Sequence, residues 1–432
     1  MTQGSGQEIV FIMHHNDRKS QIVSTDETIS GTPARLEYVR NFIKSQGYLA
    51  DHLKEDQLME IFILLARIHE YSTHHKHNNH NWETIFAPIE TQRRALEPLV
   101  DQYIREWAQS GLVQPNPHAP PTWPAGKKFA LCLTHDVDII SGISWKERLR
   151  GIPYYIEAGS KDRIIYALST IRELARSMYP LNPRQDPPID IWMTEEAKHG
   201  FRSTFFFLAS PLPAPHWEDS FYRYGDKIVF QGQKTKISLV MKQLIEGGWD
   251  IGLHGASRSS YTPAILSQEK KILDAVIGCQ AVTIRQHRLN FDIRYTPFYQ
   301  TQAGFQADST LGSNVNIAFR CGTCYPFFIY DLFSDTPLNL LEVPLIVQDV
   351  ALFRRMGLDE HLAVEQCRAV MEQVANVNGV MTILWHNNHY PDSVEFKAYC
   401  KLLDIADKMG AWGCSLKAVN SWWRERCRSL TV

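Results

Sequence analysis

Carboxylate and imidazole side chains follow four apolar, strand-like runs of this sequence. The run at residues 129–134 leads into His-Asp-Val-Asp, whose carboxylates are Asp136 and Asp138, and three later runs end in His254, His287 and His386. Residues two apart in a strand point to the same side, so both carboxylates would face one region. Carboxylate and imidazole are common ligands of catalytic Zn²⁺, although Asp-x-Asp alone is equally typical of loop capping. Four such endings favour a metal site.

Strands and helices alternate through the second part of the chain. We expect strands at residues 203–208, 250–254, 282–287, 338–344 and 381–386, and helices at 237–246, 267–276, 358–375 and 393–409. Such repetition predicts an α/β fold with a largely parallel sheet, closed or nearly closed into a (β/α) barrel. Its chemistry would lie on the loops that follow the strands.

A change in composition divides the chain. Residues 31–110 have the periodicity of amphipathic helices, and the proline-rich stretch 114–124 cannot continue a helix. We predict a smaller, mainly helical N-terminal domain at 1–113, a linker at 114–126 and the barrel at 127–432. A helical insertion at about 141–190 is basic and amphipathic. It is expected to pack on its own domain, with an anionic surface as the alternative partner.

Composition indicates an ordinary globular enzyme. With 44% hydrophobic residues, 21% charged residues and a formal net charge of -2, the chain has no basic excess that would indicate nucleic acid as a partner. The N-terminus lacks the features of a signal peptide and no apolar run reaches the roughly 20 residues of a membrane span, so we expect a cytoplasmic protein without a transmembrane segment. The eight cysteines are scattered, which favours reduced thiols over a disulfide frame.

Six ordered motifs make the chain similar to the polysaccharide deacetylases, carbohydrate esterase family 4, also described as NodB-homology domains. They are THDVD at 134–138, STFFF at 203–207, IGLHG at 251–255, RQH at 285–287, GFQADS at 304–309 and ILWH at 383–386. The resemblance covers roughly residues 125–420. It implies an irregular (β/α)7 barrel and a metal-dependent hydrolase, most often one that removes acetyl groups from N-acetylated sugars.

The resemblance also implies roles for individual residues. Asp136 corresponds to the catalytic base and Asp138 to a metal ligand, although the family more often has these two residues adjacent. The spaced form resembles a branch that includes some peptidoglycan deacetylases and cyclic-amide hydrolases. Arg285 corresponds to the arginine that orients the base, and His386 to the general acid.

The second motif departs from the family pattern, which is His-x-x-x-His. Here Arg258 stands four residues after His254, and a guanidinium cannot bind a metal. We predict that His287 replaces the missing ligand, because a strand end holds a side chain rigidly; a core-packing histidine is the alternative. A divalent ion, expected to be Zn²⁺, would then be held by Asp138, His254 and His287 with one position open.

The leading hypothesis is a metal-dependent amide hydrolase that deacetylates an N-acetylated carbohydrate or a glycan precursor. One alternative is hydrolysis of a non-sugar linear or cyclic amide on the same fold. Another is a non-catalytic glycan-binding pseudoenzyme, suggested by the lost histidine. Asp308, Arg320 and Arg258 are candidates for substrate contacts or for support of the ligands, with loop caps and ion pairs as the alternative for the first two.

Overall fold

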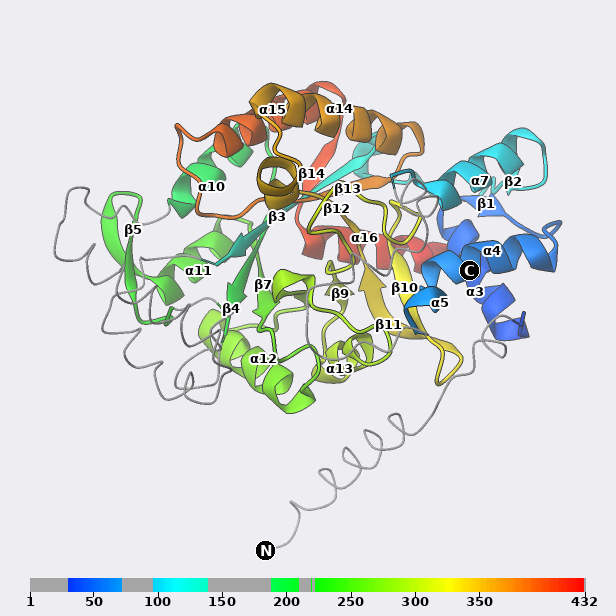
Figure 1. Ribbon diagram of the computed structural model, residues 1–432, viewed down its shortest axis with the longest axis horizontal. Helices are drawn as coiled ribbons and strands as arrows, with labels where there is room; N and C mark the ends of the chain where they lie inside the picture. Colours follow the sequence, from blue (N-terminus) through cyan, green and yellow to red (C-terminus); the bar gives the residue numbers. More distant parts are fainter. Residues whose placement is uncertain (1–29, 72–95, 139–187, 210–218, 220–221, 431–432) are drawn as a thin grey trace, which may run out of the picture.

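One curled sheet contains the strands whose ends carry the candidate site residues of the sequence analysis. In the computed structural model, the described residues are 30–71, 96–138, 188–209, 219 and 222–430. Within them ten strands form one sheet, in the order β10 (Phe327–Asp331), β11 (Thr336–Glu342), β9 (Ala307–Asp308), β8 (Thr283–Gln286), β7 (Asp250–Gly255), β4 (Thr204–Leu208), β3 (Ala130–Val137), β13 (Val380–Leu384) and β12 (Leu345–Gln348), with β14 (Trp412–Cys414) also paired to β3. Figure 1 shows how this sheet curls at the centre of the molecule.

Parallel pairing runs through the sheet. Every pair in it is parallel except β10 with β11, which is antiparallel. In the described part of the chain the edge strands β10 and β12 do not pair with each other, so the barrel is incomplete. The predicted α/β fold with an irregular barrel is therefore confirmed in the form of a curled, open sheet. Parallel pairing also brings the carboxyl ends of β3, β7, β8 and β13 to the same edge.

Burial on both faces explains why these strands read as apolar runs. All eight residues of β3 are buried, as are all five of β4 and all six of β7. Central parallel strands have this property because helices cover the sheet. Gly252 in β7 makes room for the ring of Phe206 in β4, since a Cβ atom at this glycine would lie 2.4 Å from the ring.

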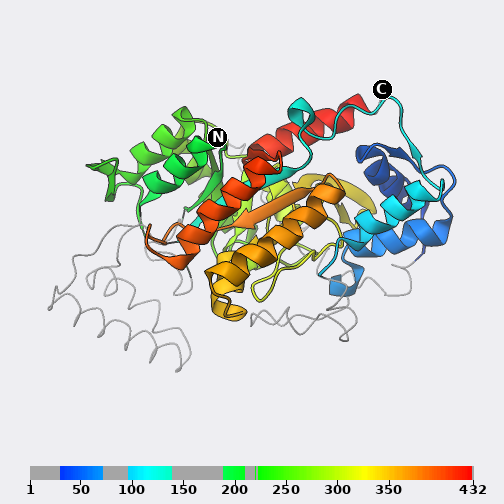
Figure 2. The ribbon, with the colours of Figure 1, turned by 90° about the horizontal axis from the view of Figure 1, so that it is seen from above.

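The helices of the barrel in the described residues are α10 (Ile189–Lys198), α11 (Ile237–Glu246), α12 (Pro263–Ile277), α13 (Thr296–Ala303), α14 (Glu360–Asn376), α15 (Val394–Lys408) and α16 (Leu416–Ser429). Four of them, α11, α12, α14 and α15, lie close to their predicted ranges, whereas α10, α13 and α16 were not predicted. Side chains of Asp359, Ser393 and Ser415 accept backbone N–H bonds and begin α14, α15 and α16. Helices α14 and α15 pack side by side over one face of the sheet (Figure 2). A hairpin of β5 (Lys227–Phe230) and β6 (Gln233–Lys236) precedes α11.

In its described ranges, 30–71 and 96–113, the N-terminal part is mainly helical, as predicted. Its helices are α3 (Pro33–Ser45), α4 (Glu55–Leu65), α5 (Ile68–Tyr71) and α7 (Leu99–Gln109), and β1 (Tyr48–Leu49) pairs with β2 (Gln114–Pro115). One residue of the proline-rich stretch is packed into the fold: Trp123 is fully buried and donates from Nε1 to the carbonyl of Asn378 at 2.7 Å. The domain boundaries remain a prediction, and most of the predicted insertion at 141–190 lies outside the described residues.

A buried ion-pair cluster joins the two parts. Glu70 lies between two arginines, with Arg67 Nη2 at 2.6 Å and Arg320 Nη2 at 3.0 Å from its oxygens. Arg67 also donates to the carbonyl of Arg320. The N-terminal helices are thus fixed to the loop that leads into β10.

Two further expectations concern the cysteines, predicted to be reduced thiols, and the predicted lack of a transmembrane segment. All eight cysteine side chains are free thiols; five of them are buried, Cys400 and Cys427 are partly buried, and Cys279 is exposed. No helix in the described ranges is long and apolar enough to cross a membrane.

Candidate active site

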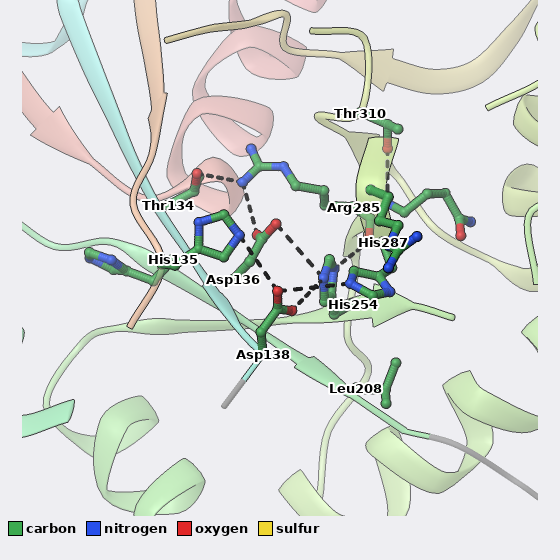
Figure 3. A network of polar contacts seen from close by, with 12 residues as sticks. Thr134, His135, Asp136, Asp138, Leu208, His254, Arg285, His287 and Thr310 are labelled. Atoms are coloured by element: carbon green, nitrogen blue, oxygen red, sulfur yellow. Dashed lines mark hydrogen bonds and ion pairs between the residues drawn. The ribbon is translucent and has the colours of Figure 1, made fainter. Parts of the chain in front are cut away.

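The three predicted metal ligands lie together at the carboxyl ends of neighbouring strands. Asp138 directly follows β3, His254 lies near the end of β7, and His287 directly follows β8. One oxygen or nitrogen atom from each lies within 4.8 Å of the others. His254 Nε2 is 3.1 Å from Asp138 Oδ1, and His287 Nε2 is 3.8 Å from Asp138 Oδ2. Figure 3 shows these side chains pointing toward one another.

Hydrogen bonds on the far side of each imidazole determine which nitrogen faces the cluster. His254 Nδ1 is 3.1 Å from the carbonyl oxygen of Arg285, which can only accept, so Nδ1 carries the proton. His287 Nδ1 donates in the same way to Asp219 Oδ1 at 3.0 Å. In the neutral form, each Nε2 therefore presents a lone pair toward Asp138. Metal-binding histidines are usually held in this way.

The chemistry of this cluster fits a divalent cation. Buried His254 Nε2 faces two carboxylate oxygens, Asp138 Oδ1 at 3.1 Å and Asp136 Oδ2 at 3.8 Å, and this negative charge beside an imidazole nitrogen favours a cation. Burial alone would raise the pKa of Asp138, but His287, His254 and His386 outweigh it and hold that pKa well below its usual range. Two imidazoles and one carboxylate are a common ligand set of catalytic zinc. These three residues could hold such an ion.

The predicted base lies beside this cluster and is held by a buried arginine. Arg285 Nη1 donates to Asp136 Oδ1 at 3.1 Å and to Thr134 Oγ1 at 2.7 Å. Its other nitrogens donate to the carbonyl and hydroxyl oxygens of Ser309 at 2.8 and 2.9 Å. The guanidinium also lies over the ring of Phe206 in β4, 4.8 Å from its centroid. Arg285 is thus fixed on three sides and orients one oxygen of Asp136, while Asp136 Oδ2 lies 3.8 Å from His254 Nε2.

The predicted acid follows β13, a strand that pairs with β3. His386 follows β13, and its Nε2 is 3.6 Å from Asp138 Oδ2. Its Nδ1 donates to Asp349 Oδ1 at 2.7 Å, and its backbone N–H donates to Asp349 Oδ2 at 2.9 Å. Burial works to lower the pKa of His386, but Asp349 outweighs it, with help from Asp138 and Asp136, and raises that pKa to about 10. At neutral pH, Nε2 therefore carries a proton that it can donate.

Two carboxylates of this site were missed by the sequence analysis. Asp349 follows the apolar run of β12, so the strand-end pattern that indicated Asp138 would have found it had residues 345–348 been recognised as a strand. Asp349 also accepts from His389 at 2.6 Å. Asp219 follows none of the strands predicted from the sequence, and no local pattern in the sequence marks it.

The remaining candidates are not brought to this cluster by any contact seen in the described residues. Arg320 pairs with Glu70, which is the ion-pair alternative. Asp308 is buried in β9, where it accepts from Gln300 and Thr310. Arg258 is exposed on the loop after β7. His135, adjacent to the predicted base, faces the opposite side of β3 and contacts Glu196 and the carbonyl of Trp385.

Comparisons with known proteins add a resemblance in structure. No protein-family model and no curated protein matches the chain. Among solved structures, a protein from Mycobacterium smegmatis assigned as a polysaccharide deacetylase aligns with 71% of this chain and 94% of its own, with 18% identity and a TM-score of 0.46. PuuE allantoinase aligns over 71% and 93%, with 12% identity and a TM-score of 0.46. One from Pseudomonas aeruginosa PAO1, also assigned as a polysaccharide deacetylase, aligns over 71% and 94%, with 11% identity and a TM-score of 0.44.

Proposed function

We propose that this protein is a metal-dependent amide hydrolase that removes acetyl groups from an N-acetylated carbohydrate or glycan precursor. One observation carries the proposal: a base and an acid flank the same candidate metal cluster. Asp136 Oδ2 lies 3.8 Å from His254 Nε2, and His386 Nε2 lies 3.6 Å from Asp138 Oδ2. Amide hydrolysis needs both proton transfers at one carbon centre.

The protein groups divide the reaction between them. A divalent ion bound by Asp138, His254 and His287 would supply Lewis acidity toward water and the amide carbonyl. Asp136 would take a proton from the attacking water, whose oxygen forms the new bond to the carbonyl carbon. His386 would donate its Nε2 proton to the nitrogen as the C–N bond breaks, releasing acetate and the free amine. Arg285 would keep the base oriented through its charge-assisted hydrogen bond.

Sequence motifs support the choice of substrate class. The motifs that contain Asp136, His254, Arg285 and His386 occur in the order found in the polysaccharide deacetylases. The same order of motifs is compatible with hydrolysis of other amides, so the experiment below includes them.

Acetate release tests the proposal. The full chain is loaded with Zn²⁺, its metal content is measured, and it is incubated with N-acetylglucosamine, its oligomers, a nucleotide-linked N-acetyl sugar and a cyclic ureide. Ring opening of the ureide is followed separately, because it releases no acetate. We expect acetate from at least one N-acetyl sugar. Replacing Asp136 by Asn should keep the metal and slow turnover by about two to four orders of magnitude, the usual contribution of a general base.

An exposed aspartate outside the candidate site, Asp51, provides the control. Asp51→Asn should leave turnover unchanged, because Asp51 is exposed in the N-terminal part. Near-normal turnover in Asp136→Asn would exclude it as the base. Hydrolysis of the cyclic ureide alone would contradict the carbohydrate substrate, and a loaded protein that hydrolyses none of these compounds would favour the pseudoenzyme.

A further inference from the structure

A carboxylate behind His287 has no place in the reaction described above. We infer that Asp219 positions His287 for the metal, and that Ser257 holds Asp219 in place. This inference rests on the proposed function, because it concerns the same metal site. The inference gives a positioning role to Ser257, in the segment after β7 where Arg258 stands in place of the second histidine of the family motif.

Asp219 is built into the site by three hydrogen bonds to one oxygen. Its Oδ1 accepts from His287 Nδ1 at 3.0 Å, from the backbone N–H of Ser257 at 2.8 Å and from Ser257 Oγ at 2.7 Å. The side chains of Asp219 and His287 are 3% and 9% exposed. The carboxylate is therefore held on the side of the imidazole that faces away from Asp138.

A second path of hydrogen bonds closes a ring around this contact. Asn290 Nδ2 donates to the carbonyl of Ser257 at 2.8 Å, and the backbone N–H of Asn290 donates to the carbonyl of His287 at 3.1 Å. Between His287 and Asn290, Arg288 and Leu289 adopt φ of 57° and 56°. Side-chain-bearing residues rarely adopt this left-handed conformation, so the turn needs support from its surroundings. Asp219 contacts His287 on one side of this turn, and Ser257 contacts Asn290 on the other side.

The two histidine ligands differ in what orients them. His254 lies within β7, and its Nδ1 donates to a backbone carbonyl of the paired strand β8. No side-chain substitution removes that acceptor. His287 lies just beyond the end of β8, and its Nδ1 depends on the side chain of Asp219. A substitution at Asp219 should therefore weaken one ligand and leave the other intact.

Metal affinity provides a test that does not depend on turnover. The full chain is stripped with a chelator, and Zn²⁺ binding is measured by competition with a chromogenic chelator. Asp219→Ala should weaken Zn²⁺ binding by about 10- to 100-fold, the usual effect of losing the partner of a metal-bound histidine. Asp219→Asn keeps the shape of the side chain and should lie between Asp219→Ala and the wild type. Ser257→Ala should produce a smaller loss, because the backbone N–H of residue 257 remains.

Asp349→Asn is the matched control. Asp349 also accepts from the Nδ1 of a histidine at a strand end, but His386 is not a proposed ligand. This variant should bind Zn²⁺ as the wild type does. The absorption spectrum of bound Co²⁺ adds a second readout, because a loosened His287 should alter the d–d bands in the Asp219 variants alone.

The outcomes separate the inference from the proposed function. A loss of tenfold or more in Asp219→Ala, with normal affinity in Asp349→Asn, supports the positioning role. If the wild type binds Zn²⁺ and both Asp219 variants bind it within about threefold, the inference is wrong while the metal site stands. A wild-type protein that binds no metal contradicts the proposed function itself. Thermal unfolding of the stripped variants checks that each is folded before its affinity is compared.

Discussion

At the scale of single residues, Asp349 influences the chemistry of this site through two imidazoles. Each of its oxygens meets a different imidazole, with Oδ1 at 2.7 Å from His386 Nδ1 and Oδ2 at 2.6 Å from His389 Nε2. Burial works to raise the pKa of Asp349, but both histidines outweigh it and hold that pKa well below its usual range. The fixed negative charge keeps His386 protonated at neutral pH, as a general acid requires.

Replacing Asp349 by Asn should therefore change the pH dependence of turnover. A general acid works only while it is protonated, and the pKa of His386 is raised to about 10 chiefly by Asp349. Without that charge the pKa of His386 falls, and the alkaline decline of kcat/KM should move down by about one pH unit or more. The measurement is a pH profile for amide hydrolysis in both proteins. A lower rate with an unchanged alkaline decline would show that Asp349 supports the structure and does not tune the acid.

The strand-end pattern predicted residues that are placed by strands. It indicated Asp136, Asp138 and His254, because each lies in or directly after a buried parallel strand. Asp349 was missed since the short apolar run of β12 was not recognised as a strand. Asp219 could not be predicted, because its place depends on tertiary hydrogen bonds to Ser257 and His287 and not on a local pattern.

At the scale of elements, the neighbouring strands β4, β7 and β8 position Arg285, which contacts the proposed base Asp136. Gly252 in β7 leaves space for Phe206 in β4, and Arg285 from β8 lies over that ring. The contact is tight, because a Cβ atom at Gly252 would lie 2.4 Å from the Phe206 ring and 2.7 Å from Thr283 Oγ1. A methyl group here would push on the support of Arg285.

Gly252→Ala should therefore lower both stability and turnover. Overpacking of a core usually costs about 1–3 kcal/mol in the free energy of unfolding, and displacement of Phe206 should disturb the contact of Arg285 with Asp136. Urea unfolding and acetate release measure the two effects. Gly225→Ala is the control, since a Cβ atom there would meet no heavy atom within 4 Å. Equal stability of the two variants would show that the sheet adapts to the added methyl group.

The predicted strands and helices of the barrel have local periodicity, whereas short elements such as β10, β12, β14 and α13 were not predicted. Helix α11 has the predicted bounds, whereas β13 ends at Leu384, two residues before His386. The shorter strand lets His386 turn toward Asp349. The burial of Trp123 in the proline-rich stretch was not predicted, because it depends on a contact with distant Asn378.

At the scale of the whole molecule, Glu70 fixes the N-terminal helices to the barrel. Burial alone would raise the pKa of Glu70, but Arg320 and Arg67 outweigh it and hold that pKa well below its usual range. A carboxyl group with a lowered pKa stabilises the fold at pH values above its ordinary pKa, near 4.5. That contribution is lost as the pH falls toward the lowered value.

Glu70→Gln should remove the carboxylate that lies between the buried guanidinium groups of Arg67 and Arg320. Breaking a buried ion pair by removing one partner commonly costs about 3–5 kcal/mol, so the free energy of unfolding at pH 7 should fall by roughly that amount. The difference from the wild type should shrink as the pH is lowered below about 4.5, because the wild-type carboxylate then loses its advantage. Urea unfolding measured from pH 7 to pH 3 tests both statements.

Glu60 provides the comparison on the neighbouring helix α4. It is exposed, and Glu60→Gln should change the free energy of unfolding by less than about 0.5 kcal/mol. A similarly small effect of Glu70→Gln would show that the N-terminal helices are held chiefly by apolar packing.

Metal content tests the central claim, that Asp138, His254 and His287 form one metal site, most directly. Elemental analysis of the purified full chain, loaded with Zn²⁺ and dialysed, should find about one ion per chain in the wild type and in Arg258→Ala. His254→Ala and His287→Ala should both lose the ion almost completely, because a site with three protein ligands has no donor to spare. Full occupancy in His287→Ala, or loss of the ion in Arg258→Ala, would contradict this assignment of the ligands.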